Sequence, residues 1–198
     1  MREKRKLRLL LSLADKKGII DFVKKLAETF LLEVVATQGT ADCLNKAGIK
    51  VKTIEEISGF PPILSGRVKS LHPKIFGAVL ADRDNLDHQQ QLDQFSLEPF
   101  DMVVVNLYPF SQTVKKKNIS LKEAVEQIDI GGTALLRAAA KNFQSIIVIT
   151  DINDYSRVVE LLKSKKGISF KQRKKYAQKV FRLVSNYDKL IFKYLKNV

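Results

Sequence analysis

Short apolar runs alternate with amphipathic stretches through most of the chain. Residues 7–13, 31–37 and 145–150 are apolar runs of strand length. Residues 101–110, DMVVVNLYPF, contain four consecutive apolar side chains, which is typical of a strand covered on both faces, and Pro109 ends the run. Because parallel neighbours need crossover connections, this alternation predicts a parallel sheet with helices on both faces.

The amphipathic stretches predict the helices. In residues 17–30 the apolar side chains recur on one helical face, and Ser120 with Glu123 forms a capping box. Residues 49–54 alternate like a third strand, and residues 75–80 are expected to form a further strand. Residues 58–74 are punctuated by proline and glycine and predict a loop. The remaining helices are expected in a short segment ending at Gly48, in 85–95, in the stretch after the DIGGT glycine turn, and in 151–163.

The last part of the chain has a different pattern. A second capping box, Ser169 with Gln172, opens a long basic helix with one apolar stripe. We expect that helix to pack on the domain or on a second copy of the chain. The predicted fold is α/β, a three-layer, doubly wound parallel sheet over residues 1–150, with C-terminal helices in 151–198 packed on the same domain. The stripe consists of Val180, Val184, Tyr187, Ile191 and Leu195.

Charge and composition narrow the function classes. The 198 residues include 35 Lys and Arg against 21 Asp and Glu, a net charge of +14, which favours anionic partners without choosing among them. Cys43 is the only cysteine, which excludes an intrachain disulfide and a thiol-based metal site, and His72 and His88 do not make a zinc site. The basic start lacks the pattern of a signal peptide, and no apolar run is long enough to span a bilayer. We therefore expect a cytoplasmic protein that is not a membrane protein and has no metal.

The candidate functional residues lie where the predicted strands end. Ligands of parallel sheets bind at the carboxyl ends of the strands, where the stretches SLADKKG, TQGT and NLYPF are expected. TQGT offers hydroxyls, a glycine and a helix start, which suit a phosphate. Arg67, Lys69 and Ser70, in the loop GRVKSLHPK, would complete a cradle for an anionic ligand.

Each candidate also has a purely structural interpretation, and at this point both stay open. A hydroxyl or carboxylate before a helix caps it, and a cation at a helix end satisfies the last carbonyls. On this interpretation Thr40 and Asp129 are helix caps, Lys141 is a C-terminal cation, Tyr108 closes the rim of the core, His72 is a turn residue, and the basic tail is a solvated helix face.

Several unusual strings in fixed order resemble a known family. DKKG (15–18), GTADCLNKAGI (39–49), ISGFPPILSGRVKSLHPK (57–74), VVVNLYPF (103–110), AVEQIDIGG (124–132) and LLRAAAKN (135–142) are similar to the IMP cyclohydrolase domain of the bifunctional AICAR transformylase/IMP cyclohydrolase proteins. The resemblance implies a methylglyoxal-synthase-like fold, closure of formyl-AICAR to IMP, no cofactor and no metal, and a homodimer. The implied partner is a purine nucleotide substrate.

The resemblance also implies roles for individual residues. The implied catalytic set is Lys69, Tyr108, Asp129 and Lys141, with Lys69 and Ser70 at the developing oxyanion and Asp129 with Lys141 taking a proton from the carboxamide. The implied substrate-binding set is Ser12, Lys16, Thr37, Gly39 and Thr40 at the 5′-phosphate, Arg67 and Asn106 at the base or ribose, and Ser70, Ile130 and Gly131.

The chain departs from the family pattern at several positions. Ala14 and Lys17 replace a serine and a threonine of the first turn, so a hydroxyl contact to phosphate is lost. Gln38 replaces a glycine, where a side chain either crowds the phosphate or is tolerated at negative φ. Ser70 replaces a threonine and keeps the hydroxyl, and Phe76 stands where a histidine is common. These changes concern affinity more than the type of reaction.

Two other function classes remain as alternatives. A non-catalytic methylglyoxal-synthase-like domain that senses a phosphorylated metabolite is favoured by Ala14 and Gln38. RNA binding is suggested by the charge alone, but the sequence has no aromatic stacking platform or RNA motif. The sequence ends where the transformylase half would begin, and it does not decide between a stand-alone enzyme and part of a longer one.

Overall fold

A computed structural model of the protein describes residues 4–115 and 119–197, and within them five parallel strands form one sheet in the order β3-β2-β1-β4-β5. Leu11 of β1 pairs with Ala36 of β2 on one side and with Val104 of β4 on the other. The sheet confirms the predicted α/β class. The strands are β1 (Lys6–Leu13), β2 (Leu31–Ala36), β3 (Lys52–Thr53), β4 (Met102–Asn106) and β5 (Ile147–Ile149).

The inner strands β1 and β4 are apolar because helices cover both faces of the sheet. Leu9, Leu10 and Leu11 of β1 are fully buried, as is Val103 of β4. The exception is Arg8, which is 6% exposed and has its guanidinium 4.4 Å from the centre of the Phe100 ring. Glu33 of β2 accepts a hydrogen bond from the Arg8 Nε at 3.2 Å, so the buried charge is paired.

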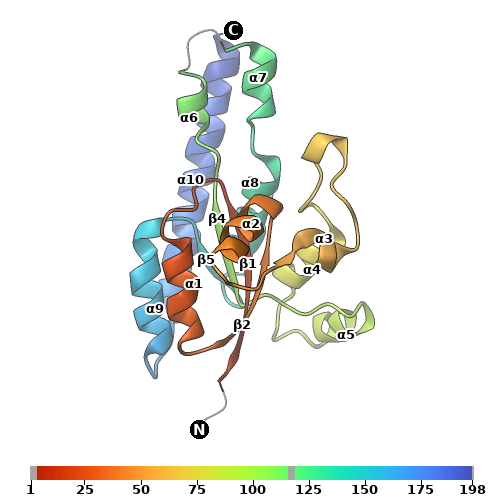
Figure 1. Cartoon of the computed structure of the whole chain (residues 1–198), viewed down its shortest axis with the longest axis vertical. Helices are drawn as coiled ribbons and strands as arrows, with labels where there is room; N and C mark the ends of the chain where they lie inside the picture. The colour runs from red at the N-terminus through yellow and green to blue at the C-terminus, as the bar shows by residue number, and fades with distance from the viewer. Residues whose placement is uncertain (1–3, 116–118, 198) are drawn as a thin grey trace.

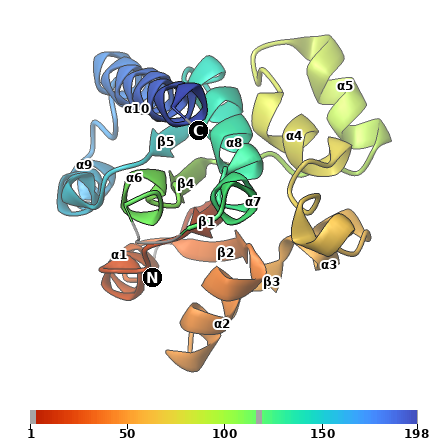
Figure 2. The same ribbon diagram turned by 90° about the horizontal axis from the view of Figure 1, so that it is seen from above.

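The helices form layers on the two faces (Figure 2). On one face α1 (Ile19–Ala27) packs against α9 (Tyr155–Lys163); on the other, α8 (Ile130–Lys141) packs against α4 (Pro73–Leu80). The remaining helices are α2 (Gln38–Lys46), α3 (Ile54–Ser58), α5 (Leu86–Gln94), α6 (Phe110–Thr113), α7 (Leu121–Glu126) and α10 (Phe170–Lys196), with short 3₁₀ turns at Leu64–Gly66 and Ile152–Asp154.

The long helix α10 packs on α8 and β5 and runs along the long axis of the molecule (Figure 1). Val180, Val184 and Tyr187 of the predicted stripe are buried against the domain, whereas Leu195 is 46% exposed. The capping box of Ser169 with Gln172 opens the helix as predicted. The division at residue 150 stays a prediction, because contacts of α9 and α10 run across it.

The strand expected in residues 75–80 is wrong, because this segment is helix α4. His72 caps the helix, its Nδ1 accepting from the Lys74 backbone N–H at 3.2 Å, and Pro73 occupies the first turn. Ile75, Ala78 and Val79 are buried at helical spacing. A short apolar run fits either element, and the proline at its start was the signal for a helix.

Two smaller expectations also need correction. The strand expected over 49–54 is confined to Lys52–Thr53, because Thr53 and Glu56 form a capping box that starts α3. The glycines of DIGGT do not form a turn before α8 but belong to its first turn, with Asp129 as the N-cap.

The order of the strands creates one crevice. The chain runs from β1 outward through β2 and β3, then returns to lay down β4 and β5 on the other side of β1. The carboxyl ends of β1 and β4 therefore flank the point where the winding reverses, which is where ligands of such sheets bind. Among the described residues, no helix combines the length and apolar character needed to cross a membrane.

Candidate active site

A cavity of about 290 Å³, called the central cavity here, opens between the carboxyl ends of β1 and β4. It gathers loops that are far apart in the sequence. Of the residues predicted for the site, those lining it are Ser12, Lys16, Thr37, Gly39, Thr40, Lys69, Ser70, Asn106, Tyr108 and Asp129.

A second cavity of about 480 Å³, the outer cavity, adjoins the first. Both cavities are lined by Gly66, Lys69, Tyr108 and Asp129. Three further predicted residues, Arg67, Ile130 and Gly131, line only the outer cavity. Asp129 thus stands at the junction of a smaller compartment beneath the sheet edge and a larger, more open one.

The start of α2 forms one end of the central cavity. Thr37 is its N-cap, so the interpretation of Thr40 as the cap is wrong. The Thr40 hydroxyl is instead fully buried and accepts a hydrogen bond from the Leu13 N–H at 3.1 Å, which ties α2 to the end of β1. Thr37 and the first helical residues Gln38, Gly39 and Thr40 line the cavity, and a helix start at this place suits a phosphate.

Gln38 lines the central cavity at this helix start. Gln38 lies in α2 and has no positive φ. The backbone at this position therefore accepts a side chain without strain. Its Nε2 donates to Asp42 Oδ1 at 2.7 Å, which holds the side chain along the helix. The next residue, Gly39, has open space in the direction a Cβ would take, so the cavity stays open above it.

Asn106 fixes the loop between β1 and α1. Its Oδ1 accepts from the N–H groups of Ala14 at 2.7 Å and Asp15 at 3.0 Å, and its Nδ2 donates to the Asp15 carbonyl. Lys16 closes the same loop by donating to the carbonyls of Leu13 and Ala14. The role of Asn106 at a base or ribose stays a prediction, since most of its hydrogen-bonding capacity holds protein backbone.

Asp129 is held from two sides. As the N-cap of α8 it accepts the Gly132 N–H through Oδ1 at 2.7 Å, and its own N–H donates to the Tyr187 hydroxyl of α10 at 2.8 Å. A Cβ on Gly132 would lie 2.6 Å from Asp129 Oδ2, so only glycine leaves room for this carboxylate. The cap interpretation is confirmed, and the same geometry places the carboxylate in the cavity wall.

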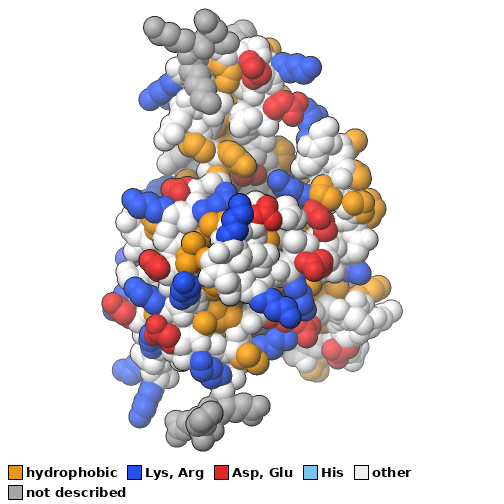
Figure 3. Space-filling view, viewed as in Figure 1, with side chains coloured by type: hydrophobic (Ala, Val, Ile, Leu, Met, Phe, Trp, Pro, Cys, Tyr) orange, Lys and Arg blue, Asp and Glu red, His pale blue; other side chains and the backbone are white. Residues whose placement is uncertain are grey.

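The loop 59–72 supplies the opposite wall. Ser70 is 3% exposed, and its Oγ lies 2.8 Å from where a Cβ on Gly131 would be, so loop and helix touch at a glycine. Lys69 is exposed at the cavity, and Tyr108, at 53% exposure, lies at its mouth. Apolar side chains of this loop also face solvent (Figure 3), where Leu64 is 67% exposed.

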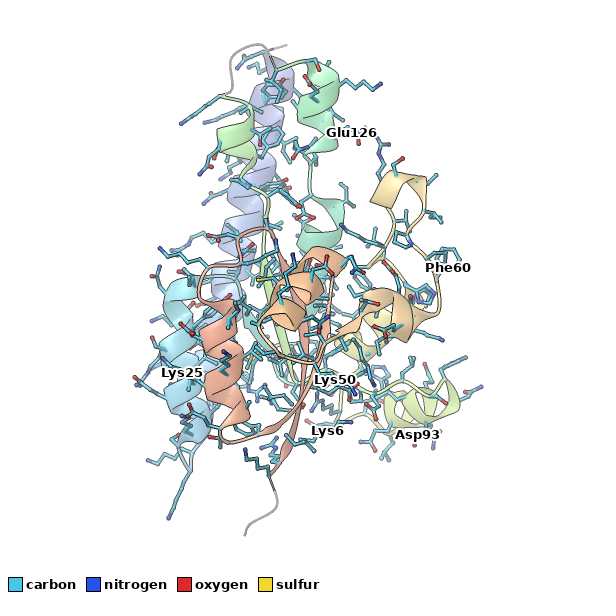
Figure 4. The ribbon with its side chains drawn as sticks, viewed as in Figure 1. Lys6, Lys25, Lys50, Phe60, Asp93 and Glu126 are labelled. Carbon is cyan, nitrogen blue, oxygen red and sulfur yellow. The ribbon has the colours of Figure 1, made fainter. Side chains whose placement is uncertain are left out.

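An ion pair links this loop to α7. Arg67 Nε donates to Glu126 Oε2 at 3.3 Å, and Glu126 lies at the end of α7 on the side facing this loop (Figure 4). The hydrogen bond and the charge of Glu126 raise the pKa of Arg67, and the hydrogen bond from Arg67 lowers the pKa of Glu126. Both side chains are exposed, so the pair is screened by solvent.

Lys141 does not join the other predicted residues. It is exposed at the last turn of α8, while Asp129 precedes the first turn. A helix of this length separates them by about 18 Å at 1.5 Å per residue. The joint role of the two side chains therefore stays a prediction, and within one chain they belong to opposite ends of α8.

The sequence analysis missed Glu55, Pro62 and Gly132, which also line the central cavity. Glu55 is the least expected, because it adds a second carboxylate to a cavity that Lys16 and Lys69 also line. The TIEE string was a capping-box signal for α3, but residues 49–54 were assigned to a strand. Among the described residues, no group of three or more His, Cys, Asp or Glu side chains is arranged to hold a metal ion.

Comparisons with known proteins place the chain among related sequences. Residues 18–134 match the family described as MGS-like domain, and residues 139–198 match the AICARFT/IMPCHase bienzyme family. The chain is 49% identical over 189 residues to the bifunctional purine biosynthesis protein PurH of Acetivibrio thermocellus and 46% identical over 191 residues to that of Bacillus subtilis. Each match covers 96% of this chain and 37% of the relative, so the chain spans little more than a third of these proteins.

One solved structure, reported as the crystal structure of ForH, is 30% identical in sequence with a TM-score of 0.79. The match covers 93% of this chain and 96% of that one.

Proposed function

Because this chain belongs to the family of MGS-like domains, and similar sequences are named as bifunctional purine biosynthesis proteins, we propose that it acts as an IMP cyclohydrolase. It would close formyl-AICAR to IMP in the cytoplasm, without a cofactor. The observation that carries this proposal is the junction of the two cavities, where Lys69, Tyr108 and Asp129 lie around one space beside a helix start suited to phosphate.

The reaction makes clear demands on the site. The carboxamide nitrogen of the substrate attacks its formyl carbon and loses a proton, and the formyl oxygen becomes the oxyanion of a tetrahedral intermediate. That oxygen takes up the proton lost by the carboxamide nitrogen and the proton of the formamido nitrogen, and it leaves as water. Since the attack is intramolecular, the protein must hold the reactive rotamer, stabilise the oxyanion and move protons.

The residues that line the two cavities can meet each of these demands. The 5′-phosphate would lie at the start of α2, near Gly39, with Lys16 nearby. The imidazole would then extend toward the junction, where Lys69 and the buried Ser70 face Asp129 across the space. We assign the oxyanion to Lys69 and Ser70, and the substrate orientation to Tyr108.

Asp129 is the base in this proposal. Its carboxylate must accept a proton from an amide, which is weakly acidic, so it needs a nearby cation that stabilises the transition state. Within one chain Lys141 lies at the far end of α8. We therefore propose a homodimer in which Lys141 of a second copy approaches Asp129.

A turnover assay tests the proposal. Purified protein with formyl-AICAR should produce the ultraviolet spectrum of IMP, and Lys69→Ala should lower the rate while the protein stays folded. Formyl-AICAR that remains unchanged in the presence of a folded wild-type protein would contradict the assignment.

The alternative is a non-catalytic domain that senses a phosphorylated metabolite. The observation that favours it is the distance between Asp129 and Lys141, which leaves the carboxylate of one chain without its cation. This alternative predicts binding of IMP without any turnover of formyl-AICAR, so the same assay combined with a binding measurement separates the two.

A further inference from the structure

A cavity larger than the central cavity lies on the other side of Asn106. This α10 cavity has a volume of about 600 Å³ and opens between the ends of β4 and β5 and the flank of α10. It has the size of a small-molecule site and shares Asn106 with the central cavity. None of the residues proposed for ring closure, apart from Asn106, lines it.

The cations of the α10 cavity differ in their partners. Lys179 is neutralised by Asp154, whose two carboxylate oxygens each lie 2.6 Å from its Nζ. Lys17 and Arg182 also line the cavity, and no described carboxylate lies within ion-pairing distance of either. Two cations are therefore available to an anion.

The acidic residues of the cavity are occupied by local donors. Asp15 Oδ1 accepts the Lys17 N–H at 2.9 Å. Asp151 Oδ1 accepts from the N–H and the Nδ2 of Asn153, both at 2.9 Å, and its Oδ2 faces the Lys179 Nζ at 3.8 Å. These contacts offset the repulsion that the carboxylates would exert on an anionic ligand.

Polar and apolar groups complete the walls. Thr150, directly after β5, lines the cavity, and its Oγ1 is buried without a hydrogen-bond partner. A buried hydroxyl without a partner is costly, so a small rearrangement that let it donate to a ligand would be favourable. Leu107 and Leu183 offer apolar surface, and Asn186 offers an amide.

We propose that the α10 cavity is a second binding site, for a nucleotide-sized organic phosphate, with Lys17 and Arg182 binding the phosphoryl group. This proposal does not rest on the proposed ring closure. The family resemblance places Lys17 where a threonine is usual, so this cation is a departure from the family pattern.

The two cavities are joined by one short loop. Ala14 and Lys16 line the central cavity, and the alternating residues Asp15 and Lys17 line the α10 cavity. Asn106 holds the N–H groups of both Ala14 and Asp15. A ligand that pulls on Lys17 therefore acts on the loop that shapes the central cavity, and by linkage the effect is reciprocal.

Calorimetric titration with AMP tests the proposal, using variants that block one cavity each. Gly39→Asp puts a negative charge at the central cavity in a position where the backbone accepts a side chain and a Cβ meets nothing. Arg182→Gln removes a cation of the α10 cavity, and Lys189→Gln, on the same helix outside the cavity, is the matched control. Circular dichroism melting establishes that each variant is folded.

We expect wild type and Lys189→Gln to bind two equivalents of AMP per chain, and Gly39→Asp to bind one. Adding Arg182→Gln to Gly39→Asp should weaken the remaining site about tenfold or more, the loss expected for a charge-assisted hydrogen bond. A folded Gly39→Asp protein that binds no AMP, or whose binding is unchanged by Arg182→Gln, would overturn the proposal.

A second titration uses inorganic phosphate on Gly39→Asp. Weaker binding than that of AMP supports an organic phosphate, because the apolar and amide walls then contribute to affinity. Equal affinity for phosphate and AMP would overturn the nucleotide-sized assignment. Both readouts measure binding alone, so they hold whether or not the protein turns over formyl-AICAR.

Discussion

The carboxylate of Asp129 combines a structural and a chemical task. Oδ1 caps α8 through the Gly132 N–H, while the side chain lines both cavities. Replacement by asparagine separates these tasks, because asparagine is as good an N-cap as aspartate but is a far weaker base. The variant therefore tests the charge with little effect on the helix.

We expect Asp129→Asn to lower kcat for ring closure by about 10²-fold or more, the usual contribution of a general base. Affinity for IMP should change by no more than about threefold, because the phosphate end of the cavity is untouched. Stopped-flow absorbance and calorimetry measure the two quantities. A variant with wild-type turnover would remove Asp129 from the mechanism.

Glu33 shows how a single residue couples charge to stability. Partial burial raises the pKa of Glu33, but the hydrogen bond from Lys6 and the charge of Arg8 outweigh it and lower this pKa from 4.5 to about 2. Its carboxylate lies 3.0 Å from the Lys6 Nζ and 3.2 Å from the Arg8 Nε. A lowered carboxyl pKa contributes stability above the unfolded pKa, and that contribution disappears as pH falls through the folded pKa.

Glu33→Gln should accordingly lower the free energy of unfolding at neutral pH, on the order of 1 kcal/mol, since Lys6 is partly exposed and screened. The difference from wild type should shrink between pH 4.5 and about 2. Urea unfolding across this range measures it. Glu160→Gln, in an exposed pair with Arg157, serves as the control, and a difference that stayed constant down to pH 2 would contradict the assignment.

At the scale of the element, α10 is part of the candidate site. The Tyr187 hydroxyl accepts the Asp129 N–H at 2.8 Å and donates toward the Gln127 carbonyl at 3.5 Å. The Tyr187 ring also packs edge-on against Phe110. Burial raises the pKa of Tyr187, so the hydroxyl stays neutral and able to make both contacts. The helix thereby positions the backbone that carries the proposed base.

We expect Tyr187→Phe to lower kcat about tenfold with KM nearly unchanged, because the Asp129 N–H loses its partner and the carboxylate its fixed position. Tyr194→Phe is the matched control, since Tyr194 lies on the same helix and also packs edge-on against Phe110. Steady-state kinetics of both variants give the comparison. Equal kinetics in the two variants would show that the Tyr187 hydroxyl does not position the base.

At the scale of the whole molecule, the position of Lys141 bears on the proposed homodimer. Asp129 and Lys141 lie at opposite ends of α8, so a dimer that brings the helices of two copies together antiparallel would place each lysine near the other copy's carboxylate. Such a twofold arrangement is the commonest symmetry of oligomers. The proposed site would then be incomplete in the monomer.

Mixing two inactive variants tests this arrangement. Asp129→Asn and Lys141→Ala, unfolded and refolded together, should recover roughly a quarter of wild-type activity, because half of the dimers are mixed and each has one intact site. Asp129→Asn mixed with Lys69→Ala is the control and should stay inactive, since both residues line the cavity of one chain. Absence of recovery in the first mixture would contradict the shared site.

Much of this structure can be predicted from the local sequence pattern. The runs at β1 and β4 predict inner strands because covered faces require apolar side chains on both sides. The capping boxes at Ser120 and Ser169 mark helix starts because their hydrogen bonds are made within a few residues. The strings around Lys69, Tyr108 and Asp129 predict a common site, because parallel strands bring their following loops to one edge.

Other features depended on the tertiary structure. The run 75–80 is apolar enough for a strand or a helix. In the folded chain it is a helix that packs against α8. The family resemblance pairs Asp129 with Lys141, but the length of α8 keeps them apart in one chain. The α10 cavity needs β5, α10 and the loop after β1 together. A local pattern reflects interactions between residues that are close in the sequence. A shared cavity, or the separation of two side chains, depends on distances between elements, and these are set only when the chain packs.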